Sequence, residues 1–350
     1  MRTGKLPPAL LSSLLSRIPC RDPRVLLGSG IGEDAAAIDF LQPAVGSGPA
    51  GDRVLVAKTD PITFATDLIG WYAVHVNAND VACTGATPRW FLASALLPSS
   101  WDEADVSRLF DQLIDACDGL GVTLVGGHTE VTGGLQQPIV VGCMLGEVER
   151  ERIVRTGGGQ PGDALLLTQG IAIEGTAVLA REAAPALRER GVPHDVIERA
   201  RGFLFQPGIS VVPAARVLRN ALAPDALHSL HDPTEGGLAA GVWELAEASH
   251  AGAVVQWAAI PVLPETRAIC DALGLDPLGL LASGALLAAV APSAAGTALA
   301  ALAGAGIPAR RIGALAAPEA GLTLIDARGQ RRPWPLFDRD EVARYFEQVG

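Results

Sequence analysis

The sequence contains little lysine and little asparagine. Of its 27 basic residues only two are lysines, Lys5 and Lys58, and only three positions are asparagine, Asn77, Asn79 and Asn220. Because arginine supplies almost all of the positive charge, a lysine inside the chain indicates a position where a compact ammonium group is wanted. Lys58 is therefore of interest, with an ordinary strand residue as the plain alternative.

Cysteine is also scarce, and no two cysteines have the spacing of a C-x-x-C motif or a zinc site. This absence argues against a disulfide framework and against a zinc fold. We therefore expect reduced, mostly buried thiols in a cytoplasmic protein. The five positions are Cys20, Cys83, Cys117, Cys143 and Cys270.

The sequence lacks the features of a targeting or membrane-spanning segment. No small-residue cleavage site follows the apolar start, so an entry helix over Pro8–Ile18 is favoured over a signal peptide. The uncharged span Pro277–Ala309 is interrupted by glycine, serine and Pro292. This predicts a buried strand after Ala285 and a helix from Ala294 rather than a membrane span.

The common nucleotide and hydrolase motifs are absent too. There is no P-loop, no Rossmann glycine pattern between a strand and a helix, no H-E-x-x-H and no G-x-S-x-G. The net charge of −11 argues against binding to nucleic acid or to an anionic membrane. With 49% hydrophobic and 19% charged residues, the 350-residue chain is typical of a folded protein of two domains.

Among the features that are present, the most suggestive is a glycine-rich turn before a short apolar strand. Gly28, Gly30 and Gly32 alternate, and Glu33 and Asp34 follow directly. Glycines allow the backbone to approach a ligand closely, whereas carboxylates hold a cation and repel a bare phosphate. The pairing therefore favours a phosphate ligand bridged by a metal, or else a plain turn.

Two further polar clusters lie next to apolar segments. The strand Val54–Ala57 runs into Lys58-Thr59-Asp60, and an acid just past a strand end is a common ligand position in α/β folds, although a turn former is an equal alternative. In the predicted helix Gly70–Gly85, Asn77 and Asp80 are three residues apart and share a face. Their burial requires partners, which are either a ligand or metal, or each other in a packed interface.

Two later clusters repeat this arrangement. A strand over Val122–Val125 runs into Gly126-Gly127-His128-Thr129-Glu130, and a helix starts after Asp232-Pro233-Thr234-Glu235-Gly236-Gly237. The helix start is a plausible anion site, or an ordinary helix cap. The Gly- and Pro-rich run Arg155–Asp163 is the predicted linker. We therefore place an N-terminal domain over residues 1–155 and a C-terminal domain over residues 163–350.

The order of these clusters resembles the aminoimidazole-ribonucleotide (AIR) synthase superfamily, also called PurM-like. This group includes thiamine-monophosphate kinase, selenophosphate synthetase and the hydrogenase-maturation protein HypE, and the later clusters are most similar to HypE-like, AIR synthase-related members. The resemblance extends from about Leu26 to Leu324. It is carried, in chain order, by Gly30–Ala36, Thr59-Asp60, Asn79–Ala82, Gly85–Pro88, Gly126–Thr129, Asp232–Gly237 and Ser283-Gly284.

The resemblance implies a two-domain α/β (α+β) fold, with an N-terminal mixed sheet that dimerises through its strands and a C-terminal α/β domain. It also implies ATP bound with Mg²⁺ through acidic side chains. The resemblance implies that the metal ligands are Asp34, Asp60, Asp80 and Asp232. Nucleotide-side positions are Gly32, Asp34, Asp60, Asn77, Gly126, Gly127, His128, Thr129 and Thr234, the paired glycines matching a turn near the nucleotide. Catalytic positions are Lys58, Asp80 and Asp232, with Lys58 facing the transferring phosphate.

Two positions depart from the family pattern. His128 stands where relatives carry an acid after the paired glycines, and we expect alternation along an extended segment to point Glu130 elsewhere. HypE proteins end in a reactive cysteine, whereas this sequence ends at Gly350 and its last cysteine is Cys270. We therefore expect that the usual HypE chemistry on its own tail does not occur.

The resemblance predicts an enzyme that moves the γ-phosphate of ATP onto an oxygen of a small-molecule or protein-bound acceptor. That oxygen belongs to an amide, a carbonyl or a phosphate. The first alternative is a small-molecule kinase like thiamine-monophosphate kinase. The second is a nucleotide-binding maturation partner protein with little turnover. In each case we expect a homodimer that binds neither nucleic acid nor membrane.

Overall fold

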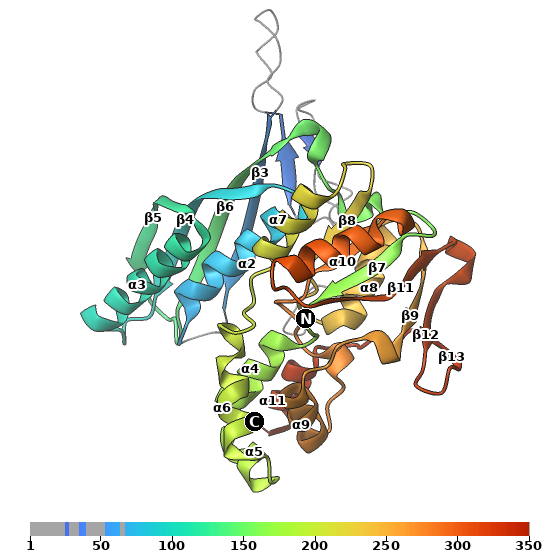
Figure 1. Ribbon diagram of the computed structural model, residues 1–350. Helices are drawn as coiled ribbons and strands as arrows, with labels where there is room; N and C mark the ends of the chain where they lie inside the picture. The colour runs from blue at the N-terminus through green and yellow to red at the C-terminus, as the bar shows by residue number, and fades with distance from the viewer. Residues whose placement is uncertain (1–24, 28–34, 40–52, 64–66, 350) are drawn as a thin grey trace, which may run out of the picture. The chain divides into compact units, whose positions relative to one another are not determined.

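The computed structural model describes residues 25–27, 35–39, 53–63 and 67–349. These residues form two compact units, one ending at Ile153 and the other beginning at Val154 (Figure 1). Among them, no helix combines the length and the apolar character that crossing a membrane requires. The predicted entry helix over Pro8–Ile18, Gly32 and Asp34 lie outside the described residues.

The N-terminal unit is built on one mixed sheet. Its strands lie in the order β1-β2-β3-β6-β4-β5, and neighbours are antiparallel except for the parallel pair β4 and β5. The strands are β1 Val25–Leu27, β2 Ala36–Ile38, β3 Arg53–Ile62, β4 Thr87–Leu97, β5 Thr123–Val131 and β6 Ile139–Glu149.

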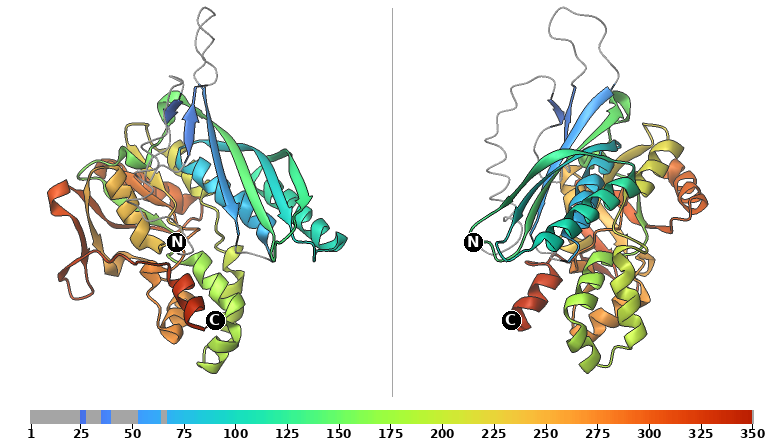
Figure 2. Two further views of the ribbon diagram at one scale, coloured as in Figure 1. Left: turned by 180° about the vertical axis from the view of Figure 1, so that it is seen from behind. Right: turned by 90° about the vertical axis from the view of Figure 1, so that its left-hand side faces the viewer.

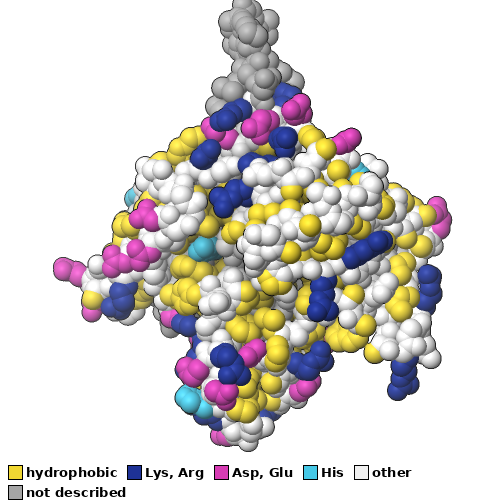
Figure 3. Space-filling view, in the orientation of Figure 1, with side chains coloured by type: hydrophobic (Ala, Val, Ile, Leu, Met, Phe, Trp, Pro, Cys, Tyr) yellow, Lys and Arg dark blue, Asp and Glu magenta, His cyan; other side chains and the backbone are white. Residues whose placement is uncertain are grey.

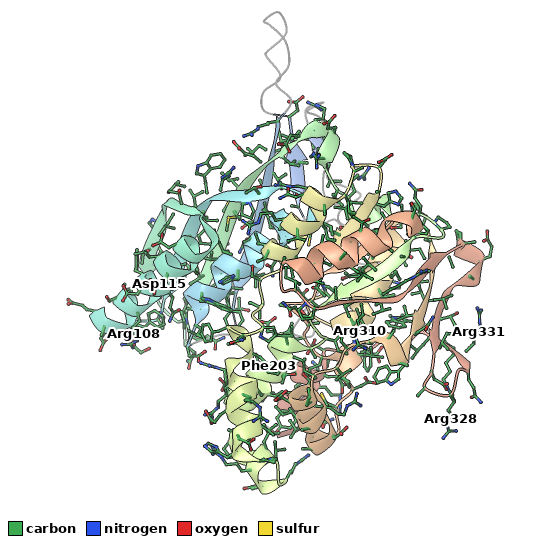
Figure 4. All side chains as sticks on the ribbon, in the orientation of Figure 1. Arg108, Asp115, Phe203, Arg310, Arg328 and Arg331 are labelled. Carbon is green, nitrogen blue, oxygen red and sulfur yellow. The ribbon has the colours of Figure 1, made fainter. Side chains whose placement is uncertain are left out.

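Two helices, α2 (Ile69–Cys83) and α3 (Glu103–Leu120), belong to this unit, and α2 packs against β3, β4 and β6. α3 begins directly after Asp102, because the Asp102 side chain accepts the N–H of Asp105 and Asp105 returns the bond in a capping box. The outer face of α3 carries charged side chains, among them Arg108 and Asp115 (Figure 4).

The two faces of the sheet differ in burial. Along β6, alternate residues such as Val140 and Met144 are fully buried, whereas the residues between them, such as Val141 and Leu145, are half-buried. A strand whose two faces differ in this way shows the period-2 alternation of a sheet with one covered face. The second face of the sheet is therefore apolar and partly open.

Two strands of this unit are longer than predicted. β3 continues through Asp60 to Ile62, so Asp60 lies within a strand rather than after its end. Pro61 has no N–H group to donate to a neighbouring strand. Because β2 pairs with residues 55–57 of β3, the proline costs no hydrogen bond between β2 and β3. β5 likewise continues to Val131, so the predicted turn at Gly126 and Gly127 is wrong: both glycines are extended, with φ of +152° and +150°.

The C-terminal unit contains a seven-stranded sheet in the order β13-β12-β9-β11-β7-β10-β8. Only the pair β12 and β9 is parallel. The interior strand β7 is buried at every position, from the apolar residues 164–167 to the polar Thr168 at its end. The strands are β7 Ala164–Thr168, β8 Leu227–His231, β9 Gly252–Gln256, β10 Leu287–Val290, β11 Ala309–Ala316, β12 Leu322–Ile325 and β13 Arg331–Pro333.

Eight α-helices are found in the described part of this unit (Figure 2). The helical segment from Ile173 to Glu189 is divided at Ala183, because Pro185 starts a new helix. In Figure 3, positively and negatively charged side chains lie close together at the lower end of the view. The helices are α4 Ile173–Glu182, α5 Ala184–Glu189, α6 His194–Arg201, α7 Val212–Ala221, α8 Gly237–Ala248, α9 Pro264–Leu273, α10 Ala295–Gly304 and α11 Glu341–Val349.

The Gly- and Pro-rich run predicted as a linker packs closely within the C-terminal unit. The Ser229 hydroxyl donates to the backbone oxygen of Thr156 at 2.7 Å. A Cβ atom at Gly158 would lie 2.1 Å from the backbone oxygen of His228. These glycines therefore serve close backbone packing rather than flexibility.

The cysteines within the described residues are free thiols, as predicted. Cys83, Cys117 and Cys270 are buried and Cys143 is partly exposed. Burial raises the pKa of Cys117 to about 11 and that of Cys270 to about 12. Neither thiol is a nucleophile at neutral pH, because the nucleophilic form is the thiolate.

Candidate functional site

The structure brings together three predicted site residues of the N-terminal unit: Lys58, Asp60 and Asp80. Nζ of Lys58 lies 2.9 Å from Oδ2 of Asp80 and 3.3 Å from Oδ2 of Asp60. Lys58 and Asp60 share a face of β3 because they are two residues apart, and Asp80 reaches them from α2. The Asp80 side chain is 8% exposed and that of Asp60 is 37% exposed. The group therefore opens toward solvent at Asp60.

Asn77 fixes the position of Asp60. Oδ1 of Asn77 accepts the backbone N–H of Asp60 at 2.8 Å. Nδ2 donates to the backbone oxygens of Ala73 at 2.8 Å and of Asp60 at 3.2 Å. Both donors of this fully buried amide are therefore engaged within the protein. Asn77, predicted on the nucleotide side, contacts the backbone of Asp60 rather than pairing with Asp80.

A glycine on the neighbouring strand leaves room for the side-chain amide of Asn77. Gly142 pairs with Asp60 across β6 and β3, and a Cβ atom there would lie 2.3 Å from Nδ2 of Asn77. The hydroxyl of Thr59 donates to the backbone oxygen of Gly142 at 2.6 Å. Packing thus ties β3, β6 and α2 together at the point where the acids meet.

The donor set of this group suits a divalent cation that is shared with phosphate. Carboxylate oxygens are the ligands that Mg²⁺ prefers, and Mg²⁺ is usually held by one or two carboxylates together with substrate phosphates. In the part of the chain that the structure describes, no three His, Cys, Asp or Glu side chains are arranged to hold a metal. Asp60 and Asp80 therefore suit an open site completed by a ligand, and Lys58 supplies positive charge between them.

His128 and Glu130 lie on the same side of β5, which corrects the expectation that Glu130 points elsewhere. Residues two apart in a strand share a face, and Nε2 of His128 lies 3.2 Å from Oε2 of Glu130. The Thr132 hydroxyl also donates to Glu130 at 3.1 Å. The hydrogen bonds from His128 and then Thr132 lower the pKa of Glu130. The His128 position thus carries an exposed imidazole–carboxylate pair.

The paired glycines beside this pair have different surroundings. A Cβ atom at Gly127 would lie 1.9 Å from the backbone oxygen of Ala93 in β4, whereas a Cβ atom at Gly126 would meet nothing within 4 Å. Gly127 is therefore required by strand packing, and Gly126 borders open space. Thr129, on the other face of the strand from His128, is exposed.

In the C-terminal unit, Asp232 follows the end of β8 and is 2% exposed. The backbone oxygen of Thr234 accepts the N–H groups of Gly237 and of Ala282, both at 3.1 Å. The site loop, which we define as Asp232–Gly237, is thereby joined to the segment that contains Ser283-Gly284. Two sequence clusters that are about 50 residues apart thus form one structure.

The predicted anion position at the start of α8 is held by a side chain of the protein. The N–H of Gly236, the N-cap residue, donates to Oδ2 of Asp340 at 2.8 Å. A carboxylate suits this position because backbone N–H groups at a helix start carry positive partial charge. The sequence clusters contained no sign of Asp340, which lies 104 residues further along the chain.

Glu174 is a second residue that the sequence did not reveal. It lies in the first turn of α4, is 1% exposed and accepts a hydrogen bond from Ser283. Its Oε1 atom has no hydrogen-bond partner within the described residues. Burial raises the pKa of Glu174 to about 7, and the charges of Asp340 and Asp232 add to this while Ser283 opposes it. The only sign of Glu174 in the sequence is its place before a glycine at the junction of a strand and a helix.

A cavity of about 510 Å³ lies elsewhere in this unit. Its charged walls include side chains of α9, of the segment after it and of α11: Arg267, Asp271, Asp276, Glu341 and Arg344. None of the residues predicted for the site lines it. The cavity therefore does not mark the predicted chemistry.

Two family comparisons decide the relationship. Residues 32–148 match the domain described as AIR synthase related protein, N-terminal domain, and residues 160–324 match the AIR synthase related protein, C-terminal domain. This chain belongs to the AIR synthase related family. The predicted membership and the predicted two-domain fold are confirmed.

HypE proteins are prominent among the relatives of this family member. The chain is 34% identical to carbamoyl dehydratase HypE of Cupriavidus necator over 278 residues, which cover 76% of this chain and 74% of that protein. It is 30% identical to a putative hydrogenase expression/formation protein of Methanocaldococcus jannaschii, with 69% of each chain covered. These relatives confirm the HypE-like character and indicate an enzyme.

Solved structures agree with this relationship. The crystal structure of hydrogenase maturation protein HypE in complex with ATP has a TM-score of 0.69 and 26% identity, and covers 86% of this chain and 88% of its own. A thiamine-monophosphate kinase from Aquifex aeolicus, 18% identical, has a TM-score of 0.63 over 83% of this chain and 93% of its own. The second likeness shows the shared fold.

Proposed function

We propose that the protein is an ATP- and Mg²⁺-dependent enzyme that activates an amide or carbonyl oxygen of an acceptor for dehydration. The single observation that carries this proposal is the Lys58, Asp60 and Asp80 group, held in place by Asn77. A carbamoyl dehydratase at 34% identity and the ATP complex of a 26% identical HypE support it.

The residues of this group have separate tasks in such a reaction. Asp60 and Asp80 would hold Mg²⁺, which supplies neutralisation of the charge that develops on a transferring phosphoryl group. The Lys58 ammonium group provides further positive charge at the same point. Asn77 keeps Asp60 in position, and such positioning accounts for much of the catalysis of phosphoryl transfer.

The buried thiol of Cys270 is poorly suited to carry the acceptor group. Cys270 is 1% exposed, and burial, followed by the charges of Asp276 and Asp271, raises the pKa of its thiol to about 12. A thiol that stays protonated and covered cannot accept a carbamoyl group. We therefore propose that the acceptor group is on a small molecule or on another protein rather than on Cys270.

Calorimetry with ATP, with and without Mg²⁺, tests the nucleotide site. The wild-type protein should bind Mg²⁺–ATP, and the double variant Asp60→Asn, Asp80→Asn should lose this binding. The double variant Asp111→Asn, Asp115→Asn is the matched control, because it removes two exposed carboxylates from α3 of the same unit. Undiminished binding by the first variant, or none by the wild type, refutes the proposed site.

A screen for ADP formation identifies the acceptor class. Candidates with a carbamoyl or other amide group should stimulate ADP release, and mass spectrometry should show loss of water from the acceptor. Thiamine monophosphate is included because formation of thiamine diphosphate would establish the kinase alternative. Turnover without any partner protein would count against a maturation partner of little activity.

The same proposal includes a homodimer formed through the N-terminal sheet. The face of this sheet opposite the buried alternate residues is apolar and half-buried, and β5 is an edge strand. Nearly all residues of β5 are exposed, including Val125 at 51% and Val131 at 67%. An exposed apolar edge strand is a usual place for a second chain to pair.

A further inference from the structure

The C-terminal segment reaches the site loop through one buried carboxylate. Asp340, just before α11, is 5% exposed, and its two oxygens accept different backbone N–H groups. Oδ2 accepts Gly236 at 2.8 Å and Oδ1 accepts Val342 at 2.8 Å. The backbone N–H of Leu281 also bonds to this carboxylate. One side chain thus holds three segments that are far apart in the sequence.

The loop that Asp340 holds has a backbone with little freedom. Gly236 and Gly237 both have left-handed φ angles, of +82° and +68°. A Cβ atom at Gly237 would lie 2.3 Å from the backbone oxygen of Leu278. Two consecutive left-handed residues are costly without glycine and persist only where their surroundings hold them. The bond to Asp340 is one of these surroundings.

The same region contains the buried carboxylates of the candidate site. The backbone oxygen of Leu281 accepts the N–H of Gly175 at 2.9 Å, which places the start of α4, with Glu174, against the segment held by Asp340. The charges of Asp340 and Asp232 both act on Glu174. A shift of Asp340 would therefore alter the loop and the electrostatics of its neighbours together.

The adjacent residue, Glu341, has a different task. Oε2 of Glu341 accepts the backbone N–H of Asp276 at 2.9 Å, and Glu341 also pairs with Arg344 at 2.6 Å. Arg344 in turn donates to the backbone oxygen of Gly274 at 3.0 Å. These bonds attach α11 to the end of α9 and do not involve the site loop. Glu341 thus joins α11 to the segment after α9, whereas Asp340 joins the start of α11 to the site loop.

We infer that Asp340 is a positioning residue for the Asp232–Gly237 site loop, through which the C-terminal segment controls ligand binding at that loop. This inference rests on the proposed function for the identity of the ligand, but not for the effect on the loop. Asp340 supplies the anion that the start of α8 requires, so the loop is set before any ligand arrives. A ligand then meets a preorganised loop, which lowers the cost of binding.

The test compares Asp340→Asn with the matched control Glu341→Gln. An asparagine replaces one carboxylate oxygen with an NH₂ group, which cannot accept a backbone N–H, so hydrogen bonding to the three N–H donors is reduced while the side-chain volume is kept. Hydrogen exchange of the Gly236 and Gly237 amides should accelerate about tenfold in Asp340→Asn, in line with the loss of one hydrogen bond to a charged group. Glu341→Gln should accelerate exchange at Asp276 and along α11 and leave the loop unchanged.

ATP turnover provides a second readout with the same two variants. At temperatures of equal folded fraction, Asp340→Asn should raise KM for Mg²⁺–ATP or for the acceptor more than it lowers kcat. Glu341→Gln should leave both constants near the wild-type values. A purely structural role would change kcat and KM of both variants to the same extent, and that outcome overturns the inference.

Two checks keep the outcome unambiguous. If Asp340→Asn does not fold, exchange in the wild-type protein decides, because the Gly236 and Val342 amides share one carboxylate and should be protected alike. A rapidly exchanging Gly236 amide in the wild type refutes the inference. If the wild type binds no ATP, the proposed function fails, while the exchange comparison still decides the role of Asp340.

Discussion

The side-chain amide of Asn77 binds both the N–H and the C=O of Asp60, at 2.8 Å and 3.2 Å. This relationship makes a helix residue responsible for the position of a strand residue. The two acids of the site in the N-terminal unit are therefore positioned differently. Asp60 is held through its backbone, whereas Asp80 projects from the helix itself. The consequences can be tested by removing the amide.

Asn77→Ala should destabilise the protein and weaken ATP binding. The N–H of Asp60 would lose its acceptor, and the loss of this bond and of the buried amide costs about 1–3 kcal/mol in the free energy of unfolding. Urea denaturation measures this cost, and calorimetry measures the nucleotide affinity. Asn220→Ala is the control, because Asn220 is an exposed asparagine on α7, and it should change stability by less than about 0.5 kcal/mol. Equal effects of the two substitutions would contradict the role of Asn77.

Lys58→Met should increase the affinity of the nucleotide-free protein for Mg²⁺. The Lys58 ammonium group pairs with both carboxylates, and its removal leaves Asp60 and Asp80 without that charge. We expect the Kd for Mg²⁺ to fall about tenfold, because the negative charge of the two carboxylates is then neutralised by the cation without competition from the lysine. Lys58→Arg, which keeps the charge, should not show this gain. The same Lys58→Met variant should turn over ATP more slowly, so the two measurements move in opposite directions.

Gly126→Ala and Gly127→Ala separate backbone strain from steric conflict. Both glycines have φ near +150°, but only at Gly127 would a Cβ atom collide with Ala93. Gly126→Ala should cost about 1–3 kcal/mol, as expected for an unfavourable φ alone. Gly127→Ala should cost clearly more, because β4 or β5 must also shift. Thermal unfolding of both variants gives the difference, and equal costs would show that the strands are not in close contact there.

Glu174→Gln should change the pH dependence of stability. The pKa of Glu174 is raised from 4.5 to about 7, so the folded state holds a proton that the unfolded chain releases. The wild type therefore loses stability relative to the variant as pH rises from 4.5 to 7, by about 3 kcal/mol in total, and is unaffected below that window. Glu182→Gln at the exposed end of the same helix is the control. A constant difference between wild type and Glu174→Gln across this range would contradict the raised pKa.

Val131→Lys should dissociate the proposed homodimer. Val131 ends the exposed edge strand β5, and a lysine there opposes pairing with a second chain. Light scattering should give the mass of a dimer for the wild type and of a monomer for the variant. Leu336→Lys, at a similarly exposed apolar position of the C-terminal unit, should stay dimeric. A wild-type monomer at micromolar concentration would remove the basis for this part of the proposal.

The sequence by itself determined the family, the two-domain architecture and most element types. These depend on local patterns: the apolar run over residues 164–167 lies in a buried strand, and Asp102 caps the helix that begins at the next residue. The order of the polar clusters identified the superfamily, because glycines and acids at several separate positions rarely recur together by chance. The roles of Asp34 and Gly32 stay predictions, since both lie outside the described residues.

Only the tertiary structure decided which groups serve as partners. Asn77 holds the backbone of Asp60, and Asp340 occupies the start of α8 from 104 residues away. Glu174 acquired its raised pKa from burial and from the charges of Asp340 and Asp232. Hydrogen-bond partners and pKa values depend on which atoms meet and how much water they lose, and those quantities are set by long-range packing. For that reason the sequence could predict where the polar clusters lie, but not which side chains position them.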